Sequence, residues 1–179
     1  RCILYQGKRM MIVTHQILTS RLEIHPMHPE EWPDVREMFL DFETSPEAIY
    51  DYPLPTTEEK AQEQVKVWSD SGYFYSVCLK GISEVIGYLC FCGEQLREMG
   101  YSFKKKYQGQ GYAQEAAQEM IAQMKQMGVN RIIAELALEN LPSRKLIERL
   151  GFTQIGAKKH LFRKETGVEQ VCGIFEKKL

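Results

Sequence analysis

Apolar residues in this chain recur either at three-and-four spacing, the period of a half-buried helix, or in short runs rich in β-branched and aromatic residues, which favour strands. The helical pattern covers residues 29–42, 58–70, 113–127 and 141–150. The strand pattern covers residues 21–24, 73–79, 85–92, 99–103, 131–138, 153–160 and 169–177. The predicted order is therefore strand, two helices, three strands, helix, strand, helix and two strands.

Residues typical of helix ends and of turns mark several boundaries of the predicted elements. Thr56 and Glu59 have the spacing of a capping box at the start of the second helix, and Gly72 follows its end. Asn140 and Gly151 bound the last helix in a similar way. A turn around residues 165–167 separates the last two strands, so we expect them to form a hairpin.

Length and composition fit a single domain. The chain has 179 residues, of which 44% are hydrophobic, so it can bury a core of ordinary size. We assign this domain to residues 10–179. Residues 1–9 precede a double methionine and are interpreted as a tag or a disordered extension.

Charge and apolar content argue against several classes of protein. A formal charge of −1 argues against a nucleic-acid coat and against a membrane-surface protein. No apolar run approaches the length of a membrane span, and no secretory signal is evident. The cysteines are odd in number and mostly lie in apolar runs, which favours reduced thiols and a cytoplasmic location; they are Cys2, Cys78, Cys90, Cys92 and Cys172.

A metal site is not expected. Cys90 and Cys92 are one residue apart, which is a poor spacing for binding one ion together. His25 and His28 have no second pair of ligands elsewhere in the chain. The sequence therefore predicts chemistry without a metal.

The segment Gln108–Ala113 is the most informative part of the chain. It reads Gln-Gly-Gln-Gly-Tyr-Ala and lies between the predicted strand at 99–103 and the predicted helix at 113–127. Glycines adopt backbone conformations that other residues avoid and let a ligand approach the main chain. The first turn of a helix presents unpaired N–H groups and a positive dipole end. The junction therefore predicts an anion site, and pyrophosphate is a typical occupant of such sites.

Two common nucleotide sites do not fit this segment. The Walker pattern requires Gly-Lys-Ser/Thr, and no Lys followed by Ser or Thr comes after Gly111. The dinucleotide fingerprint requires a third glycine within an alternating series of strands and helices, and both are missing.

The segment does resemble the Gln/Arg-x-x-Gly-x-Gly/Ala signature of the GNAT superfamily of acyl-CoA N-acyltransferases, which Gln108, Gly111 and Ala113 match. Residues 140–152 resemble the second cofactor segment of this family, in which an Asn, and a Ser three residues on, precede a short helix ending in Leu-Gly-Phe. The resemblance covers about residues 20–179. It implies an α+β fold with three α/β/α layers, in which a mixed, mostly antiparallel sheet is splayed open beside the glycine loop.

The resemblance also implies a reaction, the transfer of an acetyl group from acetyl-CoA to a primary amine by direct attack in a ternary complex. It places the pantetheine arm beside the backbone of Phe103 and Lys104, and Asn140 on the same arm, although a helix cap would look identical in sequence. Residues 104–106 either add charge near the phosphates or form a solvated turn. The residues expected to hold the pyrophosphate form the loop itself: Gln108, Gly109, Gln110, Gly111, Tyr112 and Ala113.

Direct attack needs a neutral amine, a group that takes its proton and a donor that meets the departing thiolate. Glu98, at the start of the strand before the loop, is the first candidate base; the alternative is an exposed strand-end charge. Glu135 is a second candidate because it is charged within an apolar strand. Ser143 is the candidate donor, or a plain first-turn helix serine. Many family members carry a tyrosine acid after Leu-Gly-Phe, where this chain offers His160.

Residues 41–59 combine acidic and aromatic side chains and contain no Lys or Arg. Such a segment either attracts a cationic amine or forms a solvated loop. In the family this region shapes the acceptor pocket, so the residues expected to contact the acceptor are Asp41, Glu43, Tyr50, Tyr52 and Glu135. The pattern at 107–116 resembles the branch that contains ribosomal-protein N-terminal acetyltransferases and spermidine or antibiotic acetyltransferases.

The acceptor is accordingly expected to be a protein N-terminus, a polyamine or another small cationic amine, and a homodimer is one option for assembly. Two other classes stay open. A non-catalytic acyl-CoA-binding module would keep the anion site and lack turnover, and a nucleotide-phosphate binder would bind ATP with magnesium.

Overall fold

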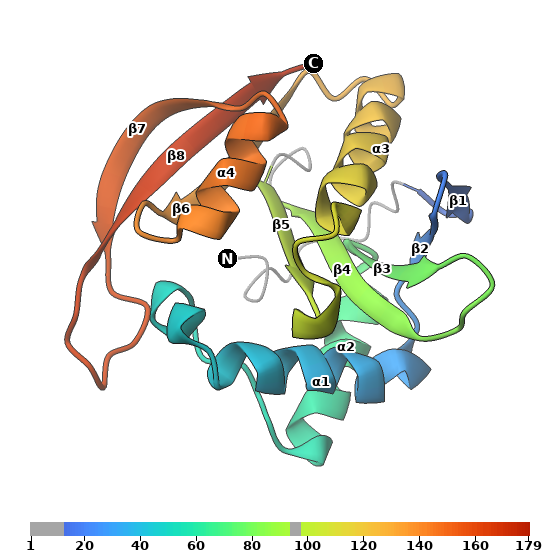
Figure 1. Ribbon diagram of the computed structural model, residues 1–179, viewed down its shortest axis with the longest axis horizontal. Coiled ribbons are helices and arrows are strands. Elements are labelled where there is room, and N and C mark those ends of the chain that lie inside the picture. Colours follow the sequence, from blue (N-terminus) through green and yellow to red (C-terminus); the bar gives the residue numbers. More distant parts are fainter. Residues whose placement is uncertain (1–12, 94–97) are drawn as a thin grey trace.

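An eight-stranded sheet forms the centre of the computed structural model, which describes residues 13–93 and 98–179 (Figure 1). The strands lie in the order β1-β2-β3-β4-β5-β6-β8-β7. Neighbouring strands are antiparallel except β5 and β6, which are parallel. In chain order they are β1 (Ile17–Leu18), β2 (Leu22–Pro26), β3 (Phe74–Leu79), β4 (Val85–Cys92), β5 (Glu98–Phe103), β6 (Arg131–Ala137), β7 (Thr153–His160) and β8 (Gln170–Lys178).

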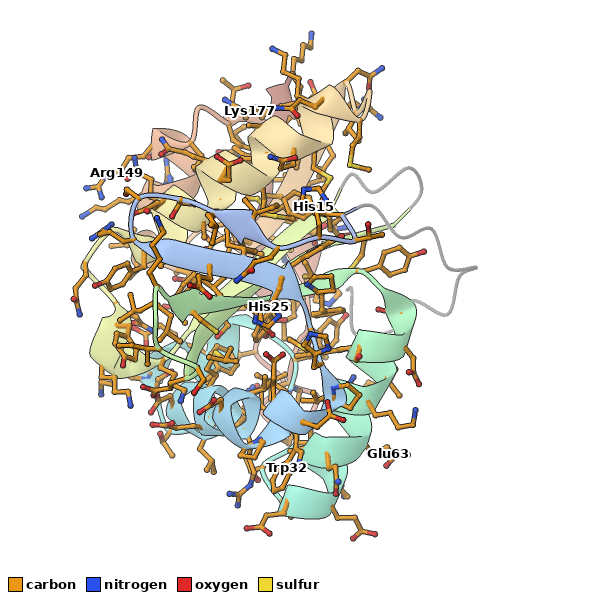
Figure 2. The ribbon with its side chains drawn as sticks, turned by 90° about the vertical axis from the view of Figure 1, so that its right-hand side faces the viewer. His15, His25, Trp32, Glu63, Arg149 and Lys177 are labelled. Carbon is orange, nitrogen blue, oxygen red and sulfur yellow. The ribbon has the colours of Figure 1, made fainter. Side chains whose placement is uncertain are left out.

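Helices cover both faces of the sheet. Helices α1 and α2 pack together on one face, and α3 and α4 lie on the other (Figures 1 and 2). Their bounds are α1 (Trp32–Glu43), α2 (Glu58–Ser71), α3 (Tyr112–Gln126) and α4 (Leu141–Arg149), and short 3-10 turns are η2 (Pro29–Glu31), η3 (Pro46–Tyr50) and η5 (Lys105–Tyr107). The three-layer α/β/α arrangement is the one predicted. Within the described ranges, no helix has both the length and the apolar character that a membrane crossing requires.

The core lies between these layers because the helices turn apolar stripes to the sheet. Trp68 of α2 stacks on Phe74 of β3 with 4.2 Å between ring centroids and meets Phe39 of α1 edge-on at 5.4 Å. Strand β4 is buried along its whole length, as expected for a strand covered on both faces. On the opposite face α3 buries the residues that fall at helical spacing: Ala116, Ala117, Met120, Ile121 and Met124.

Strands β5 and β6 separate from each other beyond their first contact. Their register contains one pair, Glu98 with Ile133, whereas β5 pairs with β4 from Glu98 through Phe103. In the described part of the chain, the later residues of β5 therefore have no strand beside them on the β6 side. This is the splayed sheet that the resemblance implied, and it leaves an opening through the middle of the fold.

The predicted order of elements is confirmed, with two differences. The sequence does not predict β1, because two residues are too few to show a period. The capping box at Thr56 and Glu59 is wrong, since α2 begins after Thr57 and the Thr57 side chain makes no capping bond.

The prediction of reduced thiols holds for three buried cysteines, Cys78, Cys90 and Cys172. It is wrong for Cys92, which is disulfide-bonded. Cys2 and the predicted extension at residues 1–9 lie outside the described residues.

Candidate active site

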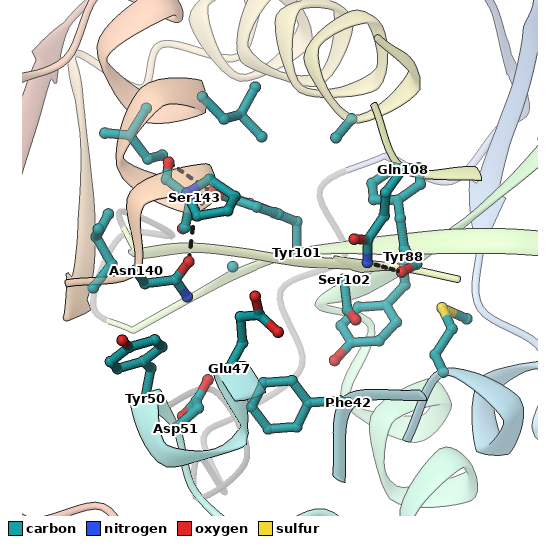
Figure 3. A pocket seen from close by; sticks show the side chains of 18 of the residues that line it. Phe42, Glu47, Tyr50, Asp51, Tyr88, Tyr101, Ser102, Gln108, Asn140 and Ser143 are labelled. Carbon is teal, nitrogen blue, oxygen red and sulfur yellow. Dashed lines mark hydrogen bonds between the residues drawn. The ribbon is translucent and has the colours of Figure 1, made fainter. Parts of the chain in front are cut away.

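A cleft of about 740 Å³ opens where β5 and β6 separate (Figure 3). Its floor is formed by β4, β5 and β6, and its walls by the glycine loop with the start of α3, by α4, and by the end of α1 with η3. The lining includes Trp68 from the α2 side of the sheet and Ile147 from the α4 side, so the cleft reaches both faces. It joins the predicted anion site to the predicted acceptor segment.

The glycine loop bends sharply before it enters α3. Gly109 has φ 74° and Gly111 has φ 82°, a left-handed backbone conformation that side chains with a Cβ disfavour. A Cβ on Gly109 would meet nothing within 4 Å, so backbone conformation and not lack of space requires glycine there. The Gln108 side chain donates to the carbonyl of Phe103 at 2.9 Å and fastens the loop to the end of β5.

The start of α3 offers free main-chain donors to the cleft. Its N-cap residue is Gly111, so no side chain caps the first turn. The N–H of Glu115 donates to the carbonyl of Gly111 at 3.0 Å, whereas the N–H groups of residues 112–114 precede the first intrahelical bond. Residues 109 and 111–114 line the cleft. The arrangement can bind an anion as the sequence predicts.

A brace formed by Arg21 and Glu115 holds this loop from behind. Glu115 accepts hydrogen bonds from the Thr19 hydroxyl at 2.6 Å and from Arg21 Nε at 2.7 Å. Arg21 Nη1 donates to the carbonyl of Gln110 at 3.0 Å, and the guanidinium lies 4.4 Å from the Tyr112 ring centroid. Burial raises the pKa of Glu115, but these bonds outweigh it and lower the pKa to about 2.

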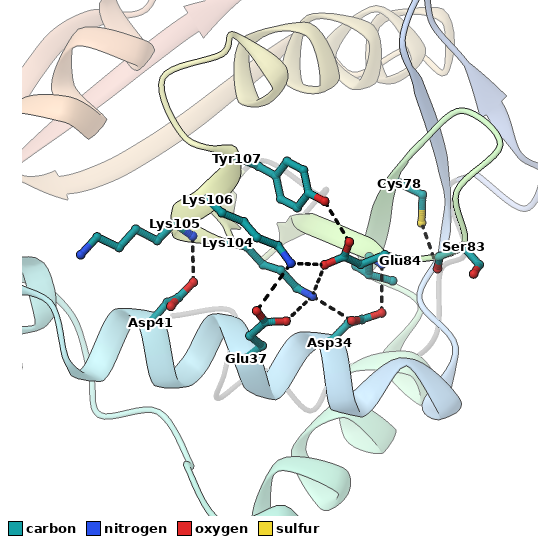
Figure 4. Close-up of polar contacts among 11 residues, drawn as sticks. Asp34, Glu37, Asp41, Cys78, Ser83, Glu84, Lys104, Lys105, Lys106 and Tyr107 are labelled. Atoms are coloured by element: carbon teal, nitrogen blue, oxygen red, sulfur yellow. Dashed lines mark hydrogen bonds and ion pairs between the residues drawn. The ribbon is translucent and has the colours of Figure 1, made fainter.

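The Lys104 side chain lies outside the cleft, in a cluster with three carboxylates (Figure 4). It is fully buried, and Nζ donates to Asp34 at 2.8 Å, Glu37 at 2.5 Å and Glu84 at 2.9 Å. Burial alone would lower the pKa of Lys104, but the three hydrogen bonds outweigh burial and hold the pKa above its usual value. The same carboxylates have a spacing that suits a metal ion, and the ammonium group already occupies the space between them.

This cluster corrects the prediction for residues 104–106. The Lys104 ammonium cannot reach a phosphate in the cleft, which leaves only its backbone for the cofactor. Lys106 contacts Glu84 at 2.7 Å, and Lys105 lines the cleft while its N–H donates to Asp41 at 2.8 Å. The sequence shows a basic run but not the acidic partners, which come from α1 and the turn before β4.

Residues at the start of α4 form the next part of the site. Asn140 caps the helix, because its Oδ1 accepts from the Ser143 N–H at 3.3 Å. The Tyr101 hydroxyl reaches across from β5 to lie 2.7 Å from Ser143 Oγ (Figure 3). All three side chains line the cleft. Sequence reasoning missed Tyr101, since strand alternation assigns it to a face but does not say which helix covers that face.

The two faces of β5 present different chemistry. Tyr101 points to α4, whereas Ser102 points to the other face and hydrogen-bonds Tyr88, whose pKa is raised by burial. Alternation along the strand puts Glu98 on the Ser102 face. Glu98 lines the cleft, as does Glu135 of β6. The Glu98 carboxylate and the Ser143 hydroxyl, which lies beside Tyr101, therefore approach the opening from opposite faces of the sheet.

Glu135, the second predicted base, has a charged partner on another strand of the sheet. The Glu135 carboxylate is 8% exposed and forms an ion pair with Lys158 of β7 at 2.9 Å.

Glu43 and Tyr52 lie behind the acceptor wall and are not among the residues that line the cleft, and their contact with substrate stays a prediction. Glu43 binds Arg163 through two bonds of 2.8 and 2.9 Å, and Arg163 Nε donates to the carbonyl of Ala48 at 2.6 Å. The Tyr52 hydroxyl lies 2.6 Å from His160 Nε2. These contacts tie the segment between β7 and β8 to η3. Gln110 also lies outside the lining and donates to the Lys106 carbonyl at 3.0 Å.

Charge and aromatic side chains divide the cleft into two ends. Lys145 and Arg149 of α4 add basic side chains to the lining. The acceptor end is acidic and aromatic, and includes the predicted Asp41 and Tyr50. Its further lining residues were not among the predicted contacts: Phe42, Glu47, Asp51, Tyr88 and Phe162.

Comparisons with known proteins agree with this geometry. Residues 21–153 match the family described as the acetyltransferase (GNAT) domain. The uncharacterized N-acetyltransferase YnaD of Bacillus subtilis (strain 168) is 33% identical over 148 residues, which cover 78% of this chain and 84% of that protein.

Solved structures share the whole fold. An acetyltransferase (GNAT family) from Bacillus anthracis has a TM-score of 0.77 at 26% identity, covering 92% of this chain and 98% of that chain. RimL, a ribosomal L7/L12 alpha-N-protein acetyltransferase in complex with coenzyme A, has a TM-score of 0.78 at 19% identity, with the same coverage of 92% and 98%. The chain belongs to the GNAT acetyltransferase family.

Proposed function

We propose that this acetyltransferase takes its acetyl group from acetyl-CoA and transfers it to a cationic primary amine, which is a protein N-terminus, a polyamine or another small amine. The observation that carries the proposal is the joining of two opposite sites in one cleft. One end presents main-chain N–H donors at a helix start, and the other end presents carboxylates and aromatic rings.

The donor end fits the diphosphate of coenzyme A. The N–H groups of residues 112–114 and the bend at Gly109 provide several donors toward one anion, and the α3 dipole adds a positive potential. Lys145 and Arg149 add basic charge nearby. The open side of β5 offers main-chain groups to an extended arm. RimL, which shares this fold, is solved in complex with coenzyme A, and this supports coenzyme A as the ligand proposed here.

The acceptor end fits a cation. Asp41 and Glu47 supply negative charge, which raises the local concentration of a cationic amine, and Asp51 adds a carboxyl group whose pKa is raised by burial. Phe42 and Tyr50 supply aromatic surface for the charged group and its aliphatic neighbours.

The reaction requires a group that takes a proton from the amine and a second group that stabilises the negative charge on the leaving sulfur. Acetyl-CoA supplies a thioester carbonyl as the electrophile. Glu98, on the Ser102 face of β5, takes the ammonium proton directly or through water, so the nitrogen lone pair becomes free to attack. Ser143, on the opposite face, donates a hydrogen bond to the leaving sulfur.

A thiol-release assay with acetyl-CoA tests this function. The acceptors are polyamines, aminoglycosides and short peptides with free N-termini, and we expect release with at least one of them. Glu98→Gln is expected to lower kcat about a hundredfold, since general bases contribute rate factors of this order. Glu63→Gln, an exposed glutamate on α2, is the matched control and should leave kcat unchanged.

Each contrary result points to a defined alternative. Coenzyme A binding without turnover of any amine would indicate a non-catalytic acyl-CoA-binding module. Magnesium-dependent ATP binding without coenzyme A binding would indicate a nucleotide-phosphate binder. Unchanged turnover in Glu98→Gln would remove Glu98 as the base and leave water or Glu135.

A further inference from the structure

We propose that Tyr101 is a positioning residue that holds the Ser143 hydroxyl so that its proton points to the sulfur leaving coenzyme A. The inference rests on the proposed function, because it needs the thioester beside Ser143. It adds to that function a residue from β5 that acts through Ser143.

The contact joins two elements that are distant in the chain. Tyr101 lies in the middle of β5, opposite Leu89 of β4, and Ser143 lies in the first turn of α4. The Tyr101 oxygen is 2.7 Å from Ser143 Oγ and 3.3 Å from the Ser143 carbonyl oxygen. The Ser143 N–H is held by Asn140 Oδ1 at 3.3 Å. The serine backbone and its hydroxyl oxygen are therefore both fixed by neighbours.

Proton counting sets the direction of the hydroxyl pair. Each hydroxyl has one proton to donate, and each oxygen can also accept. A phenol is the more acidic of the two and is the better donor, and Ser143 Oγ at 2.7 Å is a nearer acceptor for its proton than the Ser143 carbonyl at 3.3 Å, so we infer that Tyr101 donates to Ser143 Oγ. The Ser143 proton is then free for a third group, and both side chains line the cleft where that group would lie.

Tyr101 keeps its own proton during the reaction. Burial raises the pKa of Tyr101 to about 12. As the nitrogen–carbon bond forms and the carbon–sulfur bond breaks, the electron pair of the broken bond stays on sulfur, the nitrogen releases its extra proton to water, and the Ser143 O–H hydrogen bond to that sulfur strengthens. No proton leaves Tyr101 or Ser143 in this step, and the thiolate later takes its proton from water.

Other tyrosine hydroxyls of the cleft have different partners. Tyr107 donates to Glu84 at 2.8 Å, and Tyr88 is hydrogen-bonded to Ser102 on the opposite face of β5. After Leu-Gly-Phe, where many family members carry a tyrosine acid, His160 contacts Tyr52. Among the described residues, Tyr101 is the tyrosine that contacts Ser143.

Double-mutant kinetics with the full chain test the inference. Tyr101→Phe removes the hydroxyl and keeps the ring, and we expect kcat to fall about tenfold with the KM for acetyl-CoA unchanged, as for the loss of one oriented hydrogen bond. Calorimetric titration should show an unchanged Kd for coenzyme A. In a Ser143→Ala background, Tyr101→Phe should lower kcat no further, because its target is gone.

Two further variants separate positioning from packing. Ser143→Thr retains a hydroxyl and should retain the tenfold sensitivity to Tyr101→Phe. Tyr107→Phe removes a cleft hydroxyl that does not contact Ser143, so any effect it has should be the same factor with Ser143 and with Ala at that position. Thermal unfolding of each variant checks that the fold is intact.

Three results would overturn the inference. These are an unchanged kcat in Tyr101→Phe, an equal fall of kcat in the Ser143→Ala background, or a raised Kd for coenzyme A with unchanged kcat. A wild-type protein that releases no thiol with any amine would overturn the proposed function as well. An active wild type in which Tyr101→Phe and Ser143→Ala act independently would overturn this inference alone.

Discussion

The two ends of the cleft are built in different ways. The donor end comes from one continuous stretch, β5 through the first turn of α3, and its key groups are main-chain amides. The acceptor end brings together the end of α1, η3 and the segment after β7, and its key groups are side chains. A continuous stretch can be recognised from a local pattern, whereas an assembled wall depends on which distant segments meet.

Each end also has its own brace behind the surface that faces the cleft. Arg21 with Glu115 and the Lys104 cluster hold the donor end. Arg163 with Glu43, and Tyr52 with His160, hold the acceptor end. If the braces are independent, a substitution in one brace should weaken binding of the ligand at that end and leave binding of the other ligand unchanged.

The largest effect is expected on stability, from the donor-end cluster. Lys104→Met removes a fully buried ammonium and leaves three carboxylates facing one another. We expect the free energy of unfolding to fall by about 3 kcal/mol, because a broken ionic cluster leaves uncompensated charge. Urea unfolding measures this. Lys66→Met, which breaks an exposed pair with Asp70, should change it by less than about 0.5 kcal/mol.

Damage to the acceptor brace should appear in acceptor binding. Arg163→Ala removes two bonds to Glu43 and the bonds to the Ala48 and Asp51 carbonyls, so η3 loses its attachment to the segment after β7. We expect the acceptor KM to rise about tenfold with the Kd for acetyl-CoA unchanged. Arg163→Lys keeps the charge without the planar fork and should give an intermediate KM. Equal changes at both ends would show that the braces are not independent.

The opposite pattern is expected for the donor brace. Arg21→Ala frees the Gln110 carbonyl and the Glu115 carboxylate, so the glycine loop is held less firmly. Because Arg21 is 45% exposed, we expect a modest effect, a rise of about fivefold in the Kd for acetyl-CoA with the acceptor KM unchanged. Arg131→Ala breaks a similar exposed pair with Glu176 and serves as the control. A changed acceptor KM with an unchanged Kd for acetyl-CoA would show that the donor brace does not act on the donor end alone.

The smallest effect is a pH dependence carried by Glu115. Its pKa is about 2 in the folded protein and ordinarily 4.5, so its contribution to stability is present above about pH 4.5 and is lost as the pH falls toward 2. Glu115→Gln should therefore flatten part of the acid-side fall in unfolding free energy. Urea unfolding between pH 5 and pH 2.5 measures the two slopes, and identical slopes would exclude this role.

Sequence reasoning reached the donor end because its signals are local. Glycine spacing and the α3 stripe predict the bend, and residues 140–151 predict the second helix start. The sequence does not predict side-chain partners that come from distant segments of the chain. Lys104 is next to the loop in sequence, yet its charge is used by α1. Glu43 and Tyr52 have the right chemistry for an amine, but Arg163 and His160 take their polar groups.

The central claim, that the bend before α3 holds the diphosphate of coenzyme A, is tested most directly by calorimetric titration of the wild-type protein with coenzyme A and with pantetheine. The two ligands share the thiol arm, and pantetheine lacks the diphosphate together with the 3′-phosphoadenosine attached to it. The structure predicts that coenzyme A binds at least about a hundredfold more tightly, since several main-chain donors meet the anion. Equal affinities would contradict the claim.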